Sequence, residues 1–440
     1  MSDAAAQLRL AYYGDDFTGS TDALEFLTRA GLRTRLFMAT PTAAQCARLD
    51  AVGVAGLTRS MPPDAMEAAL RPAFTALREL GAPHVHYKVC STFDSSPSVG
   101  SIGRAMEVGS EIFRSRFIPL LVGAPALGRY CVFGNLFARM GIGSTGEIHR
   151  LDRHPSMSRH PVTPANESDL RKHLARQTDK GVKLFDILQV ALPEHESRAA
   201  LDRLLAEEPE VILFDVLSAE QLKLIGTLID AHAKPGEPLF SVGSSGIEMA
   251  LGSHWSAREL IQPRTSWADA GRVGPLLVVS GSCSPVTAGQ IAWAVAEGFA
   301  EVPLDAAALA AGADPSTAVP GIVSHLSAGR NVIVHTSRGP SDHAVQIASS
   351  AVGGALGKIA GQAIERTGVR RLVVAGGDSS SYAARALGIE SVEMIAPLAP
   401  GAPLCRASAP GWPIDGCEVN LKGGQVGAPD FFGAAARGRL

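Results

Sequence analysis

Short apolar runs alternate with helix-period segments along almost the whole chain. The runs that indicate strands are residues 8–13, 34–37, 52–57, 84–88, 119–122, 211–214, 239–242, 276–279, 301–303, 331–335 and 372–375. Between them, amphipathic patterns indicate helices at 22–30, 65–80 and 218–233, the last with a capping box at Ser218 and Gln221. Strands alternating with helices build parallel sheets that are covered by helices. The pattern therefore predicts an α/β protein.

A polar, proline-containing stretch at residues 254–274 interrupts this alternation and is typical of a linker. We therefore expect a cut near residue 265, with an N-terminal domain of residues 1–260 and a C-terminal domain of residues 261–440. Each domain is expected to be a mostly parallel sheet flanked by helices. A chain of 440 residues is long enough to bury two or three cores of this size.

Composition excludes several classes of protein. The apolar content of 46% and charged content of 19% are ordinary for a globular chain, and the net charge of −3 favours neither nucleic acid nor an anionic membrane. The apolar runs are too short to span a bilayer, and the N-terminus lacks a signal-peptide pattern. Six cysteines without metal spacing indicate reduced thiols. We expect a cytoplasmic protein with a small-molecule substrate. The sequence does not determine the oligomeric state, and a homo-oligomer is compatible with it.

Two glycine- and serine-rich loops, at residues 281–284 and 376–379, each connect a predicted strand to a predicted helix. Such a junction points unpaired backbone N–H groups and the positive end of a helix dipole at one spot, which suits a phosphate. Asp378 lies in the second loop, where it could hold Mg²⁺ or manage a proton. Two anion cradles in one region suggest a nucleoside triphosphate site, and the VGSSG segment at 242–246 is a weaker third cradle.

The same loops have a plainer interpretation as ordinary connections. Neither matches the Walker pattern, and neither gives G-x-G-x-x-G followed by a suitably spaced acidic residue. The residues alone therefore indicate anion binding without naming the ligand.

Polar side chains also follow several strands of the N-terminal half. Asp15 and Asp16 come after the first strand, at the edge where open α/β sheets bind ligands, and one of these carboxylates could accept a proton from a hydroxyl. The alternative is that they only close a turn. For Asp22, which fits a capping box with Glu25, the structural role is favoured.

Further candidates follow other strands. Arg59 could clamp a carboxylate through its planar guanidinium, and Lys88, Ser91 and Thr92 could hold a carboxylate or sugar hydroxyls, although Lys88 could equally be a solvated side chain. Residues 150–164, with two His-Pro pairs and three arginines, could form a basic flap over an anionic substrate or a rigid loop. A metal site there is the least favoured interpretation.

Seven motifs, in their order along the chain, resemble the four-carbon acid sugar kinase family. They are GDDFTG at 14–19, TRS at 58–60, YKVCST at 87–92, VGSSG at 242–246, GSCS at 281–284, GGDS at 376–379 and LKGGQVG at 421–427. The resemblance covers nearly the whole chain. It implies an N-terminal domain that binds the acid sugar, a C-terminal domain that binds ATP, and an active site in the cleft between them.

Carried over to this chain, the resemblance implies an ATP-dependent kinase that phosphorylates a hydroxyl of a small sugar acid, with Asp15 or Asp16 as the base. It places the acid sugar near Asp15, Asp16, Arg59 and Lys88, and the strand-end position of Ser91 and Thr92 adds their hydroxyls to this set. It places ATP on Ser282, Ser284, Gly376, Gly377, Asp378, Ser379 and Gly423 or Gly424. The position of Asp378 in its loop makes it the expected Mg²⁺ ligand.

The chain departs from the family on the substrate side. Most members read K-x-D-S-T-L-R-G after the lysine strand, whereas this chain reads KVCSTFDS at 88–95, with Cys90 in place of the aspartate and no arginine. This difference favours a related acid sugar such as 3-oxo-isoapionate. Two other interpretations compete. One is a dinucleotide-dependent dehydrogenase or isomerase, but no glycine-rich loop of this chain is followed by an acidic residue that is suitably spaced to bind a ribose. The other is a two-lobed sugar-acid sensor without catalytic activity, but a sensor would have little use for a second phosphate-binding loop.

Overall fold

The computed structural model describes residues 8–141, 145–160, 162–337, 339 and 349–439, with the side chain of Asp378 outside the description. The chain divides into two compact units. Unit 1 comprises Met1–Asp15, Phe26–Thr34 and Thr40–Thr265, and unit 2 comprises Asp16–Glu25, Arg35–Ala39 and Ser266–Leu440. Two short N-terminal segments therefore group with the C-terminal half.

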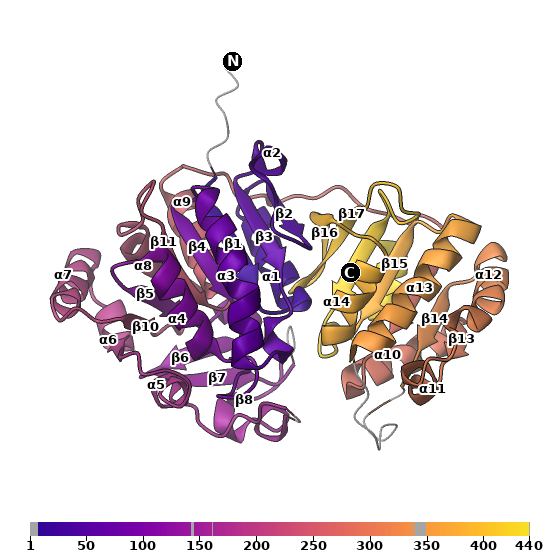
Figure 1. The fold of residues 1–440 in the computed structure, drawn as a ribbon, viewed down its shortest axis with the longest axis horizontal. Helices are drawn as coiled ribbons and strands as arrows, with labels where there is room; N and C mark the ends of the chain where they lie inside the picture. The colour runs from indigo at the N-terminus through magenta and orange to yellow at the C-terminus, as the bar shows by residue number, and fades with distance from the viewer. Residues whose placement is uncertain (1–7, 142–144, 161, 338, 340–348, 440) are drawn as a thin grey trace, which may run out of the picture. The chain divides into compact units, whose positions relative to one another are not determined.

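Unit 1 contains a parallel sheet with the strand order β3-β1-β4-β11-β5-β10-β9 (Figure 1). These strands are β1 Leu10–Gly14, β3 Ala51–Ala55, β4 His84–Lys88, β5 Ile118–Leu121, β9 Val182–Phe185, β10 Val211–Phe214 and β11 Leu239–Gly243. Strands β1, β3, β4 and β11 are buried at every position, as expected where helices cover both faces of a parallel sheet.

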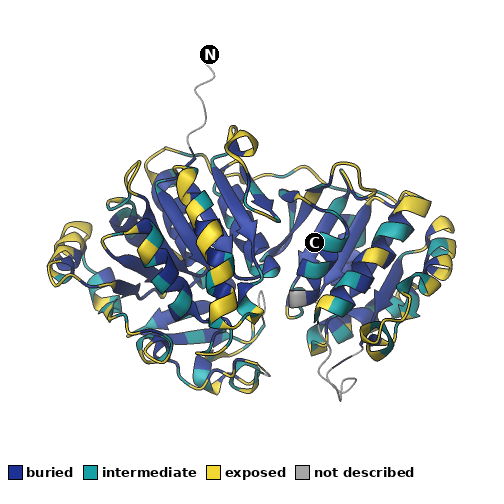
Figure 2. Cartoon of the chain, viewed as in Figure 1, coloured by how far each residue is buried: buried dark blue, intermediate teal, exposed yellow. Residues whose placement is uncertain are grey.

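Helices follow most strands of this sheet. They are α1 Phe17–Arg29, α2 Ala43–Cys46, α3 Pro63–Glu79, α4 Ile102–Phe113, α5 Leu170–Leu174, α6 Ile187–Val190, α7 Glu194–Leu205, α8 Ala219–Asp230 and α9 Gly246–Ala257. The part of α1 up to Glu25 groups with unit 2. Helix α3 packs against α4, and α8 packs against α9. Figure 2 shows the result, with buried strands and helices whose outer faces are exposed. Strands β6 Arg129–Val132, β7 Asn135–Arg139 and β8 Ile148–Arg150 form a separate antiparallel sheet.

Unit 2 contains a mixed sheet. Strands β13, β14, β12, β15 and β18 are parallel in that order, and β17, β16 and β2 continue the sheet in antiparallel pairs. The strands are β2 Thr34–Phe37, β12 Leu276–Ser280, β13 Ala300–Pro303, β14 Val332–His335, β15 Arg371–Ala375, β16 Ser391–Ala399, β17 Ala402–Ser408 and β18 Glu418–Lys422. The helices are α10 Pro285–Ala296, α11 Ala306–Ala310, α12 Val319–Ser327, α13 Ser349–Thr367, α14 Gly377–Ala386 and α15 Phe431–Arg437.

The predicted α/β class is confirmed, and the predicted strands lie within one or two residues of the observed ones. The capping box at the start of α8 is also present, because the Ser218 N–H donates to Gln221 Oε1 at 3.1 Å. Strands β9 and β18, the β16–β17 hairpin and the small β6–β7–β8 sheet have no counterpart in the prediction. Among the described residues, none of the helices is both long and apolar enough to cross a membrane.

Two local predictions are wrong. Helix α1 begins at Phe17 rather than Asp22, so Asp22 lies inside the helix and does not cap it; Gly19, Ser20 and Thr21 are weak helix formers that hid the first turn. The stretch predicted as a linker begins too early, because α9 continues to Ala257. His254 and Trp255 are buried there, and both contact Asp230 of α8, a tertiary contact that composition does not reveal.

Candidate functional site

Three neighbouring strands of unit 1 carry polar side chains to the same edge of the sheet. Asp15 follows β1, Lys88 ends β4, and Arg59 lies in the short 3₁₀ helix Thr58–Ser60 after β3. Because β3, β1 and β4 are adjacent and parallel, their carboxyl ends meet at one edge. Backbone hydrogen bonds join the three segments, since Asp15 N donates to Lys88 O at 2.9 Å and Arg59 N donates to Asp15 O at 3.0 Å.

Asp15 and Arg59 form a two-contact ion pair at this edge. Arg59 Nε donates to Asp15 Oδ2 at 3.1 Å, and Nη2 donates to Oδ1 at 2.7 Å. The aspartate side chain is 3% exposed and the arginine side chain 20% exposed. These two guanidinium donors are directed at Asp15 and hold its carboxylate in place.

Asp16 caps helix α1. Its Oδ1 accepts a hydrogen bond from Gly19 N at 2.7 Å, and its Oδ2 accepts one from Thr18 Oγ1 at 2.8 Å. Side-chain oxygens that accept from the third residue of a helix are typical of N-caps. Asp16 is 3% exposed, and its segment groups with unit 2. A Cβ built on Gly423 would lie 4.0 Å from Thr18 Oγ1, which places the Asp16 cap beside the loop that follows β18.

Lys88 is fully buried, so the interpretation of this residue as a solvated lysine is wrong. Its Nζ donates to Val89 O at 2.9 Å. Behind it, His86 is also fully buried, and its Nδ1 lies 3.1 Å from Ser241 Oγ. Burial, and secondarily the charge of Lys88, lower the pKa of His86 to about 3. His86 is therefore neutral at physiological pH.

The loop after β4 contains a tight turn, in which Phe93 N donates to Cys90 O at 2.9 Å. Ser91 and Thr92 are each 6% exposed, and Thr92 Oγ1 lies 3.0 Å from Cys90 Sγ. Burial, and then the charge of Asp94, raise the pKa of the Cys90 thiol to about 11, so this cysteine is a neutral thiol rather than a nucleophile. Phe93 has a positive φ of 57°, an uncommon conformation for a side chain of this size.

The segment at 150–164, apart from Pro161, which is outside the described residues, is held by local contacts. His154 Nδ1 accepts from the N–H groups of Ser156 and Met157 at 3.2 Å each, and His160 Nδ1 accepts from Thr163 N at 3.0 Å. Arg150 pairs with Asp152 through two contacts of 2.7 Å. The two histidines close separate turns. This geometry supports the rigid-loop interpretation.

In unit 2, the predicted nucleotide loops converge. An added Cβ on Gly281 would lie 2.8 Å from Ser379 Oγ, and one on Gly424 would lie 2.6 Å from Ser282 Oγ and 2.9 Å from Ser284 Cβ. A Cβ on Gly376, whose φ is +134°, would meet Ser379 Oγ at 2.3 Å. Three loops far apart in sequence therefore lie against one another, and glycine is required where they touch.

Two helices begin at this meeting point. Helix α10 is capped by Ser284, whose hydroxyl accepts from Val286 N at 3.2 Å. Helix α14 is capped by Gly376, which has no side-chain oxygen to offer the first-turn N–H groups. Around Gly377 nothing lies within 4 Å of an added Cβ. The N-terminus of α14 is thus an open cradle of backbone donors, as an anion requires.

Buried polar residues outside the predicted set support the loop after β18. Gln290 Nε2 donates to the carbonyls of Val426, Gly427 and Ala428 at 3.0 Å each. Thr287 Oγ1 donates to Gly424 O at 2.8 Å, and Lys422 Nζ donates to Thr287 Oγ1 at 3.2 Å. Sequence reasoning missed all three supports. The available signal was that Lys422 stands directly before Gly423 at a strand end.

The remaining predicted features contribute less. The side chain of Asp378 lies outside the described part of the structure, so its place as a Mg²⁺ ligand stays a prediction; its backbone is in the first turn of α14. Among the described residues, no group of three His, Cys, Asp or Glu side chains could hold a metal ion. The VGSSG segment is tightly packed, because a Cβ on Gly246 would lie 2.3 Å from Gly123 O.

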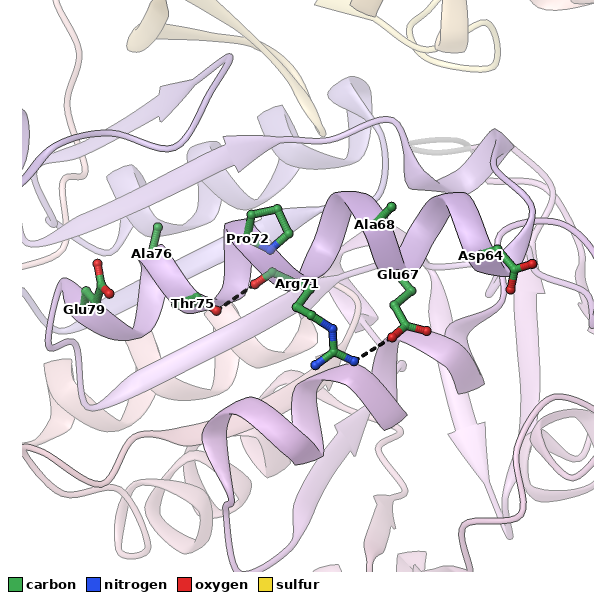
Figure 3. Close-up of a pocket in the computed structure, with 8 residues that line it drawn as sticks. All are labelled: Asp64, Glu67, Ala68, Arg71, Pro72, Thr75, Ala76 and Glu79. Atoms are coloured by element: carbon green, nitrogen blue, oxygen red, sulfur yellow. Dashed lines mark hydrogen bonds and ion pairs between the residues drawn. The ribbon is translucent and has the colours of Figure 1, made fainter.

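A groove runs along the outer face of helix α3 (Figure 3). It is lined by side chains of this helix alone, with Arg71 paired to Glu67 at 2.6 Å and to Glu111 of α4 at 2.9 Å. These are exposed charges that satisfy one another. None of the strand-end residues lines this groove, which has the character of an ordinary charged helix surface.

Comparison with known proteins also distinguishes an N-terminal from a C-terminal domain. A family model described as a sugar-binding N-terminal domain matches residues 10–251, and one described as a nucleotide-binding C-terminal domain matches residues 277–432. A 3-oxo-isoapionate kinase of Paraburkholderia graminis is 45% identical over 457 residues, which cover 99% of this chain and 95% of that protein. A 3-oxo-tetronate kinase of Methylobacterium radiotolerans is 34% identical, with 97% and 98% covered.

A solved structure from Salmonella typhimurium LT2, provisionally named a tRNA synthase, matches with a TM-score of 0.80 at 26% identity, covering 99% of this chain and all of that one. The fold is thus shared over the full length. The chain belongs to the family that joins these sugar-binding and nucleotide-binding domains, and the resemblance drawn from its motifs is confirmed.

Proposed function

We propose that this member of the sugar-acid kinase family transfers the γ-phosphoryl group of ATP to a hydroxyl of a small sugar acid. The observation that carries the proposal is the convergence of three glycine loops on the N-termini of α10 and α14. Kinase names among the full-length relatives support the same reaction. Because the reaction consumes ATP, we place it in the cytoplasm.

On the nucleotide side, the chain supplies backbone donors and hydroxyls. The N–H groups of the first turn of α14 bind phosphate oxygens, assisted by the hydroxyls of Ser282, Ser284 and Ser379. Phosphoryl transfer depends mainly on positioning and on neutralising charge around the transferred group, which such donors achieve. Gly376, Gly377, Gly423 and Gly424 let the phosphates approach the main chain closely.

Mg²⁺ is the metal that this chemistry implies. In nucleotide sites it keeps several waters and is bound through one or two carboxylates together with the phosphates, so a large protein cage is not expected. Asp378, the second residue of α14, is the carboxylate in these loops, and the neighbouring serine hydroxyls fit the water shell. Bound there, the metal would neutralise phosphate charge.

On the sugar-acid side, Asp16 is the residue that accepts the proton of the attacking hydroxyl. Of the two adjacent carboxylates, Asp15 is held by Arg59, whereas Asp16 groups with unit 2 beside Thr18 and Gly423. A carboxylate engaged by an arginine is the weaker base. Lys88 and the Asp15–Arg59 pair then set the charge around the substrate carboxylate, and Ser91 and Thr92 bind its hydroxyls.

The substrate is a 3-oxo sugar acid. The 3-oxo-isoapionate kinase is 45% identical to this chain, whereas the 3-oxo-tetronate kinase is 34% identical. The higher identity supports 3-oxo-isoapionate as the substrate. The replacement of the family aspartate by Cys90, a neutral thiol at physiological pH, removes one carboxylate from the substrate loop. We therefore place 3-oxo-isoapionate ahead of unbranched four-carbon acids.

The test is a coupled assay of ADP release with ATP, Mg²⁺ and a panel of four- and five-carbon sugar acids and their 3-oxo forms. Turnover with 3-oxo-isoapionate above the four-carbon acids is expected. Turnover with a different acid on the panel would correct the substrate and retain the kinase. If ATP·Mg²⁺ neither turns over nor raises the melting temperature of the protein, the kinase proposal is wrong.

A further inference from the structure

Lys422 is a fully buried lysine at the carboxyl end of β18. Of the described side chains, the hydroxyl of Thr287 is the one within hydrogen-bond distance of its Nζ, at 3.2 Å. The ring centroids of Phe431 and Phe432 lie 5.5 and 6.0 Å away, where their faces attract a cation weakly. A buried ammonium is costly unless an opposite charge accompanies it.

No described carboxylate forms an ion pair with Lys422. Asp16, whose cap of α1 lies beside the loop after β18, accepts hydrogen bonds from Gly19 N and Thr18 Oγ1. Helix α10 and strand β12 have no titratable residue. On the loop after β18 and on α15, Asp430 and Arg437 pair with each other at 3.3 Å and are partly exposed. Arg371 and Glu418 pair at the opposite end of β15 and β18. Burial alone accounts for the lowering of the pKa of Lys422 to about 7.

The surroundings of Lys422 are positive in sign as well. Thr287 is the third residue of α10, so the ammonium lies beside the N-terminal turn of a twelve-residue helix. The dipole of this helix adds partial positive charge at the same place. A buried cation and a helix N-terminus directed at one region make a site that is completed by an anion.

A short chain of contacts connects Lys422 to the proposed phosphate loops. Lys422 Nζ donates to Thr287 Oγ1, which donates to Gly424 O at 2.8 Å. Gly424 in turn lies against Ser282 and Ser284, where an added Cβ would be 2.6 Å from Ser282 Oγ. Two hydrogen bonds therefore connect the Lys422 ammonium to Gly424, in the loop on which the phosphates are proposed to lie.

We propose that Lys422 is a positioning residue whose missing counter-charge is the phosphate group of the bound nucleotide. The inference rests on the proposed nucleotide site. The lysine holds Thr287 and thereby the Gly424 carbonyl, and the phosphates above that loop stabilise its protonated form. Because an anion that favours the protonated lysine must draw a proton from solvent when the free site is neutral, nucleotide binding is linked to proton uptake.

The linkage has a defined pH window. In the free protein Lys422 is mostly protonated below pH 7 and about one-tenth protonated at pH 8. ATP affinity should therefore be nearly constant below pH 7 and fall above it, by at most about tenfold per pH unit. Lys422→Arg, which keeps its charge throughout this range, should bind with an affinity that varies much less with pH.

The experiment is titration calorimetry of the full chain with ATP·Mg²⁺ at pH 8 in buffers of different ionisation enthalpy. Wild type is expected to take up roughly half a proton or more per bound nucleotide, and Lys422→Met close to none. Lys223→Met, at an exposed position on α8, is the matched control and should behave as wild type. Circular dichroism and thermal melting establish that each variant is folded.

The outcomes separate the two proposals. If wild type does not bind ATP, the proposed function fails and this inference fails with it. If wild type binds but Lys422→Met takes up the same number of protons, the nucleotide site stands and the role of Lys422 is wrong. Loss of uptake in Asp378→Asn with retention in Lys422→Met would assign the proton to a different group and would also overturn the inference.

Discussion

Asp15 and Arg59, 44 positions apart in the sequence, meet through two hydrogen bonds of 2.7 and 3.1 Å at the carboxyl edge of the unit 1 sheet. The pair exists because β1 and β3 are neighbouring parallel strands whose ends lie side by side. It separates the roles of two adjacent aspartates, because it engages Asp15 and leaves Asp16 to cap α1 beside Gly423.

Removing Arg59 should destabilise the protein, because a buried carboxylate without its ion-pair partner is unfavourable. In Arg59→Met, the buried Asp15 carboxylate loses both guanidinium donors, and we expect the free energy of unfolding at pH 7 to fall by about 2–4 kcal/mol. Urea unfolding measures this directly. The double variant Asp15→Asn/Arg59→Met should lose less than the single one, and an equal or larger loss would contradict the pairing argument.

Replacing Asp16 by Asn tests its chemistry separately from its structural role. Asparagine is also a good N-cap, so Asp16→Asn should change unfolding free energy by less than about 1 kcal/mol. Turnover should fall by about 10²–10⁴-fold, because the amide cannot accept the proton. ATP affinity should be unchanged. Turnover near that of wild type would remove Asp16 from the base role.

Glycine substitutions test the convergence of the nucleotide loops. In Gly424→Ala the new Cβ would lie 2.6 Å from Ser282 Oγ, so the loops must separate, and we expect the KM for ATP to rise at least about tenfold with little change in the KM for the sugar acid. Gly289→Ala on α10 is the control, since nothing lies within 4 Å of its Cβ. It should stabilise the helix by up to about 1 kcal/mol. Equal effects of both changes would argue against the site.

Thiol labelling provides a footprint of the same loops. All six cysteines lie in the described part of the chain, and Cys283, in the GSCS loop, is the exposed one. A maleimide should therefore label Cys283 first at pH 7, while Cys90, with a pKa of about 11, reacts slowly. ATP·Mg²⁺ should slow the labelling of Cys283 several-fold. Mass spectrometry identifies the site, and labelling unaffected by saturating ATP would place the nucleotide elsewhere.

The buried lysine should also make the stability of the nucleotide-free protein depend on pH. The pKa of Lys422 is about 7 in the folded state against 10.5 when unfolded, so between these values the unfolded chain binds more protons and unfolding free energy rises with pH. The contribution is at most about 1.4 kcal/mol per pH unit. In Lys422→Met this part of the rise should disappear in urea unfolding measured from pH 6.5 to 9.5. An identical slope in both proteins would contradict the assignment.

Local features of the fold were predictable from sequence because they depend on local periodicity. Strands such as β10 and β12 are nearly continuous apolar runs, the pattern expected of a strand that is buried on both faces. The antiparallel pair β16 and β17 was missed because polar and apolar residues do not alternate in it. The positions of β16 alternate between buried and half-buried, but apolar Ile395 and Pro397 occupy two of the half-buried ones. The start of α1 was missed because the weak helix formers Gly19, Ser20 and Thr21 follow the Asp16 cap.

Some features of the candidate site were likewise predictable from the sequence, and others were not. Sequence alone identified which residues stand at strand ends and which loops contain glycine, since both are properties of neighbouring positions in the chain. Only the tertiary structure decided that Arg59 pairs with Asp15, that Lys88 is buried, and that Gly424 lies against Ser282. These relationships depend on which strands are adjacent and on what covers them. Adjacency and burial are set by packing between distant segments, which no local pattern in the sequence encodes.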